Sequence, residues 1–237
     1  MSSRYERSEL LLGKESTARL RASHVAVFGL GGVGSYAVEA LARAGVGELT
    51  LIDCDVYSES NLNRQLFALP RTVGVLKTDA AAARVAEIDP SITVHTVAQF
   101  MLPETVASLP FSDFDCILDA IDTVSAKIAI AQCAAREDIP MISAMGAGNK
   151  LDPTAFRVAP IEKTKGCPLA RVMRTELARR GIRGVTAVYS EEPPRKSGLT
   201  DEESGKPIPG SLPFVPSVVG LIMAGEAVKR LCFSEQI

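Results

Sequence analysis

A glycine-rich turn between an apolar run and an alanine-rich run constrains this chain more than any other feature. Residues 25–34 read Val-Ala-Val-Phe-Gly-Leu-Gly-Gly-Val-Gly, and the glycines are Gly29, Gly31, Gly32 and Gly34. Their small size permits a tight turn and lets backbone N–H groups approach a phosphate at the helix N-terminus. The pattern predicts a strand, a phosphate-binding turn and a helix in succession. The alternative is a turn that only lets the strand and the helix pack closely.

Short β-branched runs alternate with alanine-rich runs through the first half of the chain. Strands are predicted over 24–29, 48–53, 93–98, 115–119 and 140–144, and helices over 33–44, 77–88 and 125–137. Further strands at 156–159 and 184–189 flank a basic helix over 168–180, and a last helix covers 216–231. Such alternation is typical of a parallel sheet covered by helices. We expect an α/β fold with a Rossmann-like, doubly wound, mainly parallel sheet that the C-terminal half continues into a mixed sheet.

The overall charge disfavours a protein that binds nucleic acid through its whole surface. A net charge of -2 gives no global attraction to phosphate backbones. Basic residues are nevertheless in excess over 163–196, and Arg171, Arg174 and Arg179 are compatible with one stripe on a helix. This stripe is a candidate contact for RNA phosphates. The alternative is a solvated helix face.

No segment predicts export or insertion into a membrane. The N-terminal residues carry charges instead of the apolar core of a secretory signal. The longest apolar stretch, 212–225, is shorter than the roughly twenty residues that a spanning helix needs. We therefore expect a cytoplasmic protein with no membrane partner.

The cysteines and histidines predict little chemistry. The five cysteines are widely spread and include no Cys-x-x-Cys pair, so neither a disulfide framework nor a zinc knuckle is expected. Cys167 follows a lysine-rich turn, a setting that favours a reactive thiol, although a buried apolar role is the alternative. His24 and His95 fall in predicted strands and form no recognisable catalytic pair.

Polar residues beyond the second strand distinguish the candidate nucleotides. Asp53 ends that strand, where a carboxylate can accept hydrogen bonds from ribose hydroxyls, and this serves NAD and ATP equally. Asn61 and Arg64 follow, and a guanidinium there can neutralise charge on a leaving pyrophosphate. Lys77 opens the next helix, a place that suits a phosphate ligand. These cations favour ATP over the NAD of an oxidoreductase, although an ordinary solvated lysine remains the alternative for Lys77.

Two carboxylates end a further strand at the sheet edge where ligands collect. Asp119 still belongs to the strand, whereas Asp122 starts the following loop. We therefore expect Asp122 to hold magnesium and Asp119 to cap the loop.

These motifs, taken in order, resemble the ThiF/MoeB/HesA superfamily of ubiquitin-activating-like adenylating enzymes. The resemblance implies that ATP and Mg adenylate a substrate carboxylate. It implies that Asp53 binds ribose, that Asn61, Arg64 and Lys77 contact phosphates, and that Asp122 binds the metal. The opening Arg4-Tyr5-Glu6-Arg7 also resembles the start of family members. It implies a homodimer in which Arg7 reaches the nucleotide of the neighbouring subunit. The residues expected to be catalytic are Arg64, Lys77, Asp122 and Arg7.

Three later segments, 145–153, 163–171 and 210–220, resemble the tRNA threonylcarbamoyladenosine dehydratase branch of that superfamily. The branch implies an ATP-dependent dehydratase that adenylates the carboxylate of threonylcarbamoyladenosine at tRNA position 37 and cyclises it. The alternative is an adenylating activator of a ubiquitin-like sulfur-carrier protein, for which the missing Cys-x-x-Cys pairs are a departure. A sulfur-relay protein is a further candidate partner. An NAD-linked oxidoreductase or a nucleotide-sensing module is the third interpretation.

The resemblance extends over nearly the whole chain and implies one adenylating domain over 1–237. Residues 1–150 are expected to form its nucleotide-binding half and 151–237 its substrate and acceptor half. Within the second half, 191–209 combine a Pro-Pro pair and acidic residues with little apolar content. We expect that segment to be a mobile loop.

Overall fold

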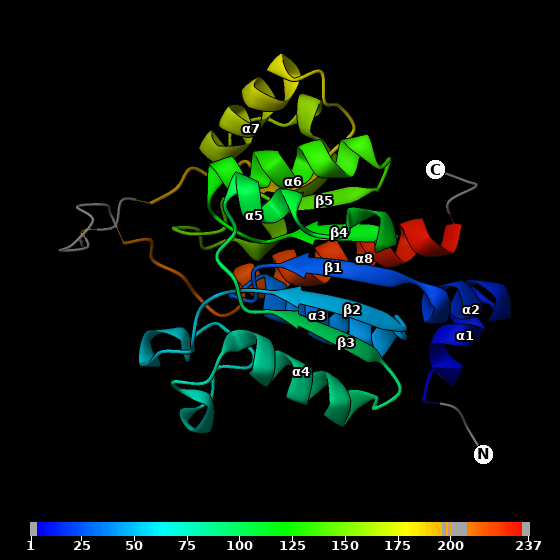
Figure 1. Ribbon diagram of the computed structural model, residues 1–237. Coiled ribbons are helices and arrows are strands. Elements are labelled where there is room, and N and C mark those ends of the chain that lie inside the picture. Colours follow the sequence, from blue (N-terminus) through cyan, green and yellow to red (C-terminus); the bar gives the residue numbers. More distant parts are fainter. Residues whose placement is uncertain (1–3, 196–197, 199, 201–207, 234–237) are drawn as a thin grey trace.

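Within the described residues, seven strands form one continuous sheet in the order β3-β2-β1-β4-β5-β7-β6 (Figure 1). The structure is a computed structural model and describes residues 4–195, 198, 200 and 208–233. All neighbouring strands pair in parallel except β6, which pairs antiparallel with β7 at the sheet edge. The strands are β1 (His24–Phe28), β2 (Glu48–Ile52), β3 (Thr93–Val97), β4 (Cys116–Asp119), β5 (Met141–Ala144), β6 (Phe156–Pro160) and β7 (Thr186–Ser190).

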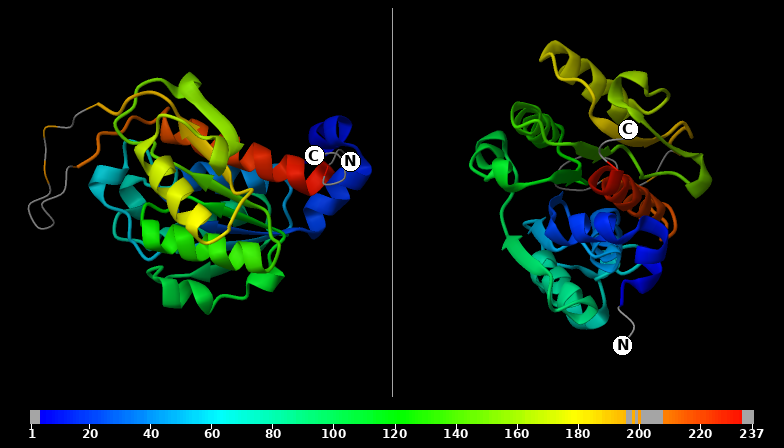
Figure 2. Two further views of the ribbon diagram at one scale, coloured as in Figure 1. Left: turned by 90° about the horizontal axis from the view of Figure 1, so that it is seen from above. Right: turned by 90° about the vertical axis from the view of Figure 1, so that its right-hand side faces the viewer.

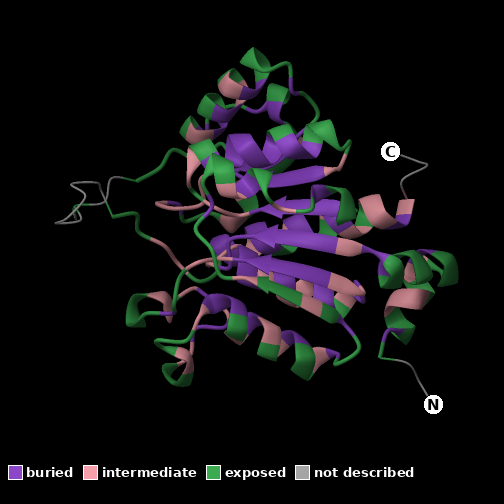
Figure 3. Cartoon of the chain, in the orientation of Figure 1, coloured by how far each residue is buried: buried purple, intermediate pink, exposed green. Residues whose placement is uncertain are grey.

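Helices cover both faces of the sheet (Figure 2). The helices are α1 (Glu6–Leu12), α2 (Lys14–Ala22), α3 (Gly34–Ala44), α4 (Lys77–Ile88), α5 (Pro103–Ala107), α6 (Val124–Arg136), α7 (Pro168–Arg179) and α8 (Pro216–Phe233). Because side chains alternate along a strand, Val25 and Val27 belong to the core under α3, α4 and α8, whereas Ala26 and Phe28 belong to the core under α5, α6 and α7. The central strands are therefore buried from both sides, as Figure 3 shows.

The expected fold class is confirmed, and the expected strands and helices lie within about two residues of those observed. Three helices, α1, α2 and α5, were not predicted. These helices are short, and α1 contributes no buried residue. The sequence there therefore lacks the regular spacing of apolar residues from which a helix is predicted.

The C-terminal helix completes the core of the N-terminal half. α8 packs so closely on α3 that a Cβ at Gly220 would lie 2.2 Å from the carbonyl oxygen of Val33. The two expected halves therefore share one core, and their division into nucleotide and acceptor functions stays a prediction. Most of the loop expected over 191–209 lies outside the described residues, so its expected mobility stays a prediction too.

A buried carboxylate fastens the N-terminal segment to the end of α4. Asp89 accepts hydrogen bonds from the Tyr5 hydroxyl at 2.6 Å and from Arg21 Nη1 at 2.9 Å, and Arg4 Nη1 lies 3.3 Å away. Burial raises the pKa of Asp89, but hydrogen bonds from Ser91, Tyr5 and Arg21 outweigh it and hold that pKa well below its usual range. Asp89 is therefore a charged anchor for the segment that carries α1.

The cysteines lie mainly in the interior. All five are free thiols, and Cys54 is the half-buried one while the others are buried. Cys167 is 4% exposed and belongs to the core under α6 and α7, which favours the apolar role over the reactive one. Among the described helices, none combines the length and the apolar character needed to cross a bilayer.

Candidate active site

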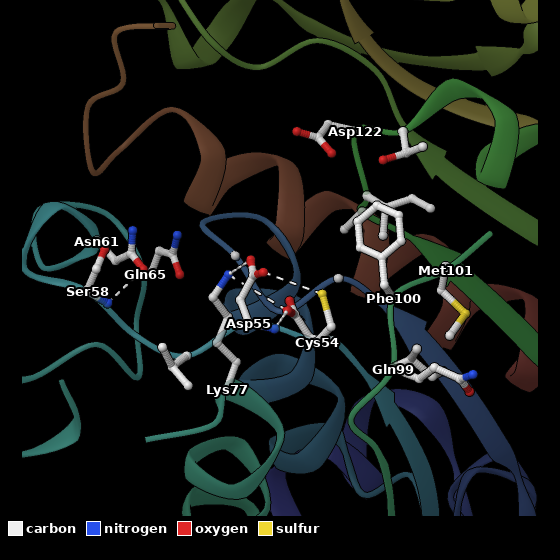
Figure 4. Close-up of a pocket in the computed structure, with 18 of the residues that line it drawn as sticks. Cys54, Asp55, Ser58, Asn61, Gln65, Lys77, Gln99, Phe100, Met101 and Asp122 are labelled. Carbon is white, nitrogen blue, oxygen red and sulfur yellow. Dashed lines mark hydrogen bonds and ion pairs between the residues drawn. The ribbon is translucent and has the colours of Figure 1, made fainter. Parts of the chain in front are cut away.

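A cavity of about 440 Å³ opens at the carboxyl ends of β1 to β4 (Figure 4). The strand order reverses between β1 and β4, and open α/β sheets bind ligands at such a point. The described residues that line it are Gly29, Gly31, Ile52, Asp53, Cys54, Asp55, Val56, Ser58, Asn61, Arg64, Gln65, Lys77, Gln99, Phe100, Met101, Ala120, Ile121, Asp122 and Thr123. The cavity thus brings together most of the residues predicted from the sequence, except Gly32, Gly34 and Arg7.

Close packing requires glycine at two positions of the turn, Gly29 and Gly34, and leaves little room for a side chain at Gly32. Gly29 has a φ of +86°, and a Cβ there would lie 2.8 Å from the carbonyl oxygen of Ala120. A Cβ at Gly34 would lie 1.7 Å from the carbonyl oxygen of Gly29, so α3 approaches β1 as only glycine allows. A Cβ at Gly32 would lie 3.1 Å from the ring of Pro216. The packing explanation therefore holds for these positions, in addition to the ligand role predicted for the turn.

Gly31 is the glycine of the turn whose missing side chain leaves space beside the cavity. A Cβ at Gly31 would have Gln65 Nε2 as its nearest neighbour, at 3.8 Å. Gln65 is itself 7% exposed, and its Oε1 has no hydrogen-bond partner within the part of the chain that the structure describes. A buried amide oxygen without a partner is costly, so it indicates a ligand or water that the cavity holds. The sequence analysis assigned no role to Gln65.

Asp53 fixes the glycine turn to the loop after β2. Its Oδ2 accepts a hydrogen bond from the backbone N–H of Leu30 at 2.7 Å, and its Oδ1 accepts one from the N–H of Asp55 at 2.9 Å. Each carboxylate oxygen has a second lone pair. Asp53 can therefore position the turn and still accept hydrogen bonds from ligand hydroxyls.

Lys77 is a buried cation at the first residue of α4, and it is not the solvated lysine of the alternative interpretation. It is 6% exposed, and its Nζ lies 2.7 Å from Asp55 Oδ2 and 3.8 Å from Asp53 Oδ1. Burial raises the pKa of Asp55, but the hydrogen bond and the charge of Lys77 outweigh it and lower that pKa overall. Figure 4 shows Lys77 and Asp55 facing each other on the cavity wall.

Arg64 and Asn61 lie on the segment that follows Ser58. Asn61 Oδ1 accepts a hydrogen bond from the N–H of Ser58, which closes a short helical turn over Glu59–Asn61. Arg64 Nη1 donates to the carbonyl oxygen of Ser60 at 2.7 Å and to Asn63 Oδ1 at 3.0 Å. These bonds hold a half-buried guanidinium at the edge of the cavity, with other N–H groups left for a ligand.

The two carboxylates after β4 have different environments. Asp122 is exposed and lines the cavity. Asp119 is fully buried, lies 2.9 Å from Lys127 Nζ, and accepts a hydrogen bond from Ser143 Oγ at 2.6 Å. Lys127 Nζ also donates to the carbonyl oxygen of Ile121 at 3.0 Å. Asp119 thus holds the loop that carries Asp122, and the magnesium role expected for Asp122 stays a prediction.

The loop after β3 adds an apolar wall that the sequence analysis missed. Gln99, Phe100 and Met101 line the cavity, and the Phe100 side chain is 54% exposed. Figure 4 shows Phe100 on the side of the cavity away from Asn61. The rule that ligands collect at the carboxyl ends of parallel strands points to this loop as well, because it follows the third strand.

Arg7 does not reach this cavity within one chain. It lies in α1, which packs beyond the amino ends of the strands, whereas the cavity lies at their carboxyl ends (Figure 1). Arg7 is exposed, whereas Arg4 and Tyr5 of the same motif contact Asp89. A role in the site of a second subunit stays a prediction.

The basic stripe on α7 is smaller than the sequence suggested. Arg174 Nη1 donates to the carbonyl oxygen and the hydroxyl of Thr164, at 2.7 and 2.9 Å. Arg179 pairs with Glu176 at 2.7 Å. Arg171 is exposed. Arg174 therefore anchors the segment before α7 and is a poor choice for an RNA contact.

The cavity has the features that a nucleoside triphosphate requires. Its volume lies within the range of small-molecule sites. The glycine turn precedes the N-terminus of α3, where backbone N–H groups and the helix dipole favour phosphate. Lys77 and Arg64 supply positive charge, and Gln65 has an unpartnered acceptor on the wall. These residues fit ATP and extend from the glycine turn to Asp122.

Comparisons with known proteins agree with this arrangement. The ThiF family model matches residues 5–236. A Bacillus subtilis protein named tRNA threonylcarbamoyladenosine dehydratase is 45% identical over 98% of this chain and 95% of its own length. The Escherichia coli protein of the same name is 38% identical over 77% of this chain and 71% of its length. A crystal structure of the Escherichia coli dehydratase in complex with ATP aligns with a TM-score of 0.89, at 33% identity over 98% of this chain and 95% of that chain.

Proposed function

The chain belongs to the ThiF family, and from that membership we propose that it is an ATP-dependent dehydratase acting on threonylcarbamoyladenosine in tRNA. The proposed reaction adenylates the carboxylate of this nucleoside at tRNA position 37 and then closes it to a cyclic form. The names of its relatives support the substrate. A relative solved with ATP supports the nucleotide.

One observation carries the proposal from the side of the structure. A lysine that is 6% exposed opens a helix at the wall of the cavity where the strand order reverses. Burying an ammonium group is unfavourable unless attraction to negative charges offsets the loss of hydration. Asp55 offsets part of this loss, and the phosphate oxygens of ATP would offset more.

The chemistry divides into two balanced steps. A carboxylate oxygen of the nucleoside attacks the α-phosphorus of ATP, and the bond to the β-phosphate oxygen breaks as pyrophosphate leaves. A nucleophile of the same nucleoside then attacks the activated carbonyl carbon, AMP leaves, and the proton of the nucleophile passes to solvent. Cyclisation within one nucleoside has a high effective concentration, so the route needs no covalent bond to the enzyme. This agrees with the burial of Cys167.

The residues of the cavity have separate roles in this scheme. Asp53 would accept hydrogen bonds from the ribose, and the N–H groups around Gly31 would bind phosphate. Arg64 and Lys77 would neutralise the charge that grows on the departing pyrophosphate, with Asn61 as a further phosphate contact. Asp122 would hold a magnesium ion, which supplies additional charge neutralisation at the phosphates.

The dimer and the RNA surface are parts of the same proposal. Arg7 would complete the site of a neighbouring subunit, because it is exposed and lies away from its own cavity. Exposed basic residues of α7, of which Arg171 is an example, would contact the phosphates of tRNA. Substituting Arg171 should weaken tRNA binding and reduce its salt dependence, whereas substituting Arg174 should mainly loosen the Thr164 segment.

ATP–pyrophosphate exchange tests nucleotide, chemistry and acceptor together. Exchange is measured with and without bulk tRNA that carries the threonylcarbamoyl group, and it should require that tRNA. Lys77→Ala and Arg64→Ala should each lower the rate by about a hundredfold, as expected for removal of one transition-state contact. Lys229→Ala is the matched control, because this lysine is 55% exposed on α8 and should leave the rate unchanged.

The outcome also decides between acceptors. Exchange that responds to a Gly-Gly-ending carrier protein and ignores modified tRNA would replace the dehydratase with an activator of sulfur carriers. Formation of AMP at the parental rate by both Lys77→Ala and Arg64→Ala would contradict the assignment of the phosphate site. Tight binding of NADH without affinity for ATP would contradict the proposal as a whole.

A further inference from the structure

Both histidines of the chain lie close together near the amino ends of the strands, on the opposite side of the sheet from the ends that form the cavity described above. The sequence contains two histidines, His24 and His95, and they lie 71 positions apart. They occupy β1 and β3, on either side of β2, and their ring centroids are 5.7 Å apart. Glu48 at the start of β2 faces both rings. The three residues lie at or near the amino ends of neighbouring strands, whereas the proposed nucleotide site lies at the carboxyl ends.

Strand pairing explains why these side chains share one face. His24 is paired with Glu48, and His95 is paired with Thr50, two residues further along β2. Because successive side chains of a strand alternate between faces, Glu48 and Thr50 point the same way. This is the face on which Phe114 packs edge-on against His24 at 5.0 Å. The cluster is therefore built into the register of the sheet.

The geometry points to a site for a divalent transition metal of the zinc class. His95 Nε2 lies 2.7 Å from Glu48 Oε1, and His24 Nδ1 lies 3.5 Å from the same oxygen. The three donor atoms all lie within 4.8 Å of one another. In a tetrahedral zinc site with bonds of about 2.0–2.1 Å, ligand atoms are about 3.3 Å apart. We propose that His24, Glu48 and His95 bind Zn²⁺ or a similar ion, with water completing the coordination.

A second contact orients His24 as metal ligands are oriented. Its Nε2 lies 2.8 Å from Thr50 Oγ1. When that hydrogen bond uses the proton on Nε2, the lone pair of Nδ1 is free to bind an ion beside Glu48. Metal-binding histidines in proteins commonly donate their other N–H to an oxygen in this way.

The surroundings favour a cation and keep the ligands accessible. The cluster lines a cavity of about 550 Å³, whose described lining residues include Glu48, Asp113 and Asp115 but no lysine or arginine. His95 is 52% exposed and Glu48 is 39% exposed, so an ion can enter from solvent.

The structure describes a second cluster of possible metal ligands, and it is less suited to an ion of the zinc class. Asp53, Cys54 and Asp55 also bring their ligand atoms together, but Lys77 Nζ already lies 2.7 Å from Asp55. The ammonium supplies positive charge there. Imidazole nitrogens also prefer zinc, copper or nickel to magnesium, whereas carboxylates alone prefer harder ions.

Zinc titration of the full-length, tag-free chain tests the proposal. Calorimetry with Zn²⁺ alone should show one ion bound per chain, and Mg²⁺ should not compete. Spectra of protein labelled with ¹⁵N-histidine contain two ring systems, and both should shift together up to one equivalent of zinc. His95→Gln and Glu48→Gln should each weaken binding at least about tenfold, since even indirect partners of metal sites have effects of that size.

Cys54→Ser is the matched control, because it removes the only cysteine that is not buried and should leave zinc affinity unchanged. His95 lies half exposed on the edge strand β3, so His95→Gln should fold normally, which circular dichroism would verify. Unchanged affinity in His95→Gln, loss of binding in Cys54→Ser, or no binding at millimolar zinc would each overturn the site. None of these measurements depends on the proposed dehydratase activity.

Discussion

At the scale of single residues, the glycine turn separates folding from ligand binding. Gly34→Ala places a methyl group where the carbonyl oxygen of Gly29 lies, 1.7 Å from the ideal Cβ. We expect it to cost at least about 3 kcal/mol of unfolding free energy, or about 6–12 °C in Tm. Gly31→Ala should leave Tm nearly unchanged, because its methyl group meets nothing closer than 3.8 Å.

Gly31→Ala should instead raise KM for ATP about tenfold or more, because the methyl group enters the cavity. Thermal unfolding and steady-state kinetics on the two variants provide the comparison. A large drop in Tm for Gly31→Ala with normal KM would show that the turn serves packing at this position too.

Gln65 offers a second separation of stability from function. Its buried Oε1 has no hydrogen-bond partner among the described residues, so Gln65→Leu removes an unsatisfied acceptor. We expect Tm to stay equal or to rise slightly, while KM for ATP rises about tenfold. A fall in Tm at unchanged KM would mean that the amide is satisfied within the fold and does not contact the nucleotide.

At the scale of elements, a buried ion pair joins β4, β5 and α6 beneath the loop of Asp122. Lys127→Met leaves Asp119 charged and fully buried with Ser143 as its remaining side-chain partner among the described contacts. Removing one partner of such a pair typically costs about 3–5 kcal/mol. Chemical denaturation should show this loss, and Lys127→Met/Asp119→Leu should recover much of it. Additive losses in the double variant would show that the two charges do not interact.

The anchor between the N-terminal segment and α4 predicts a dependence on pH. The folded state lowers the pKa of Asp89 below its value near 4 in an unfolded chain. The unfolded state therefore binds the proton more readily, and stability is lost as the pH falls below about 4. Asp89→Asn should lower Tm at pH 7 by about 4–8 °C, the equivalent of about 2 kcal/mol.

Thermal scans of both proteins between pH 7 and pH 3 check this anchor. The difference in Tm should shrink toward pH 3, because the unfolded parental chain takes up a proton at Asp89 below about pH 4 while the folded state keeps the carboxylate ionised. A difference that stays constant over this range would mean that the charge of Asp89 contributes nothing.

At the scale of the whole molecule, the proposed dimer can be tested by complementation. Arg7→Ala should inactivate the neighbouring subunit's site, and Lys77→Ala should inactivate its own. A heterodimer of the two would contain one site with both residues intact. After subunits exchange, an equal mixture should regain about a quarter of the parental activity, because half of the dimers are mixed and each has one intact site. A mixture as inactive as its components would contradict the shared site.

Much of the fold follows from the local sequence, but the meeting of distant residues does not. The alternation of strands and helices predicts β1 to β5 and the large helices because each has its own apolar period. Asp53, Arg64, Lys77 and Asp122 were expected near one another because each follows a strand or opens a helix at the same edge of the sheet. Their roles stay predictions, although the cavity contains all of them.

The histidine cluster escaped the sequence analysis for a physical reason. His24, Glu48 and His95 come together only when β1 and β3 both pair with β2 in a particular register. Strand order and register depend on the packing of the whole chain, so no local pattern signals them. Gln65 was missed because a missing hydrogen-bond partner is visible only in a structure.

The cavity is lined, among the described residues, entirely by positions 29–123. Ancestors of such a chain could therefore inherit the ATP-binding part unchanged while β6, β7 and α7 diverged to suit another acceptor. Chimeras that join residues before β5 to the remainder of a distant relative should keep nucleotide turnover and exchange their substrate preference. Such chimeras must preserve the contact of α8 with Gly32 and α3, because α8 would come from one parent protein and Gly32 and α3 from the other.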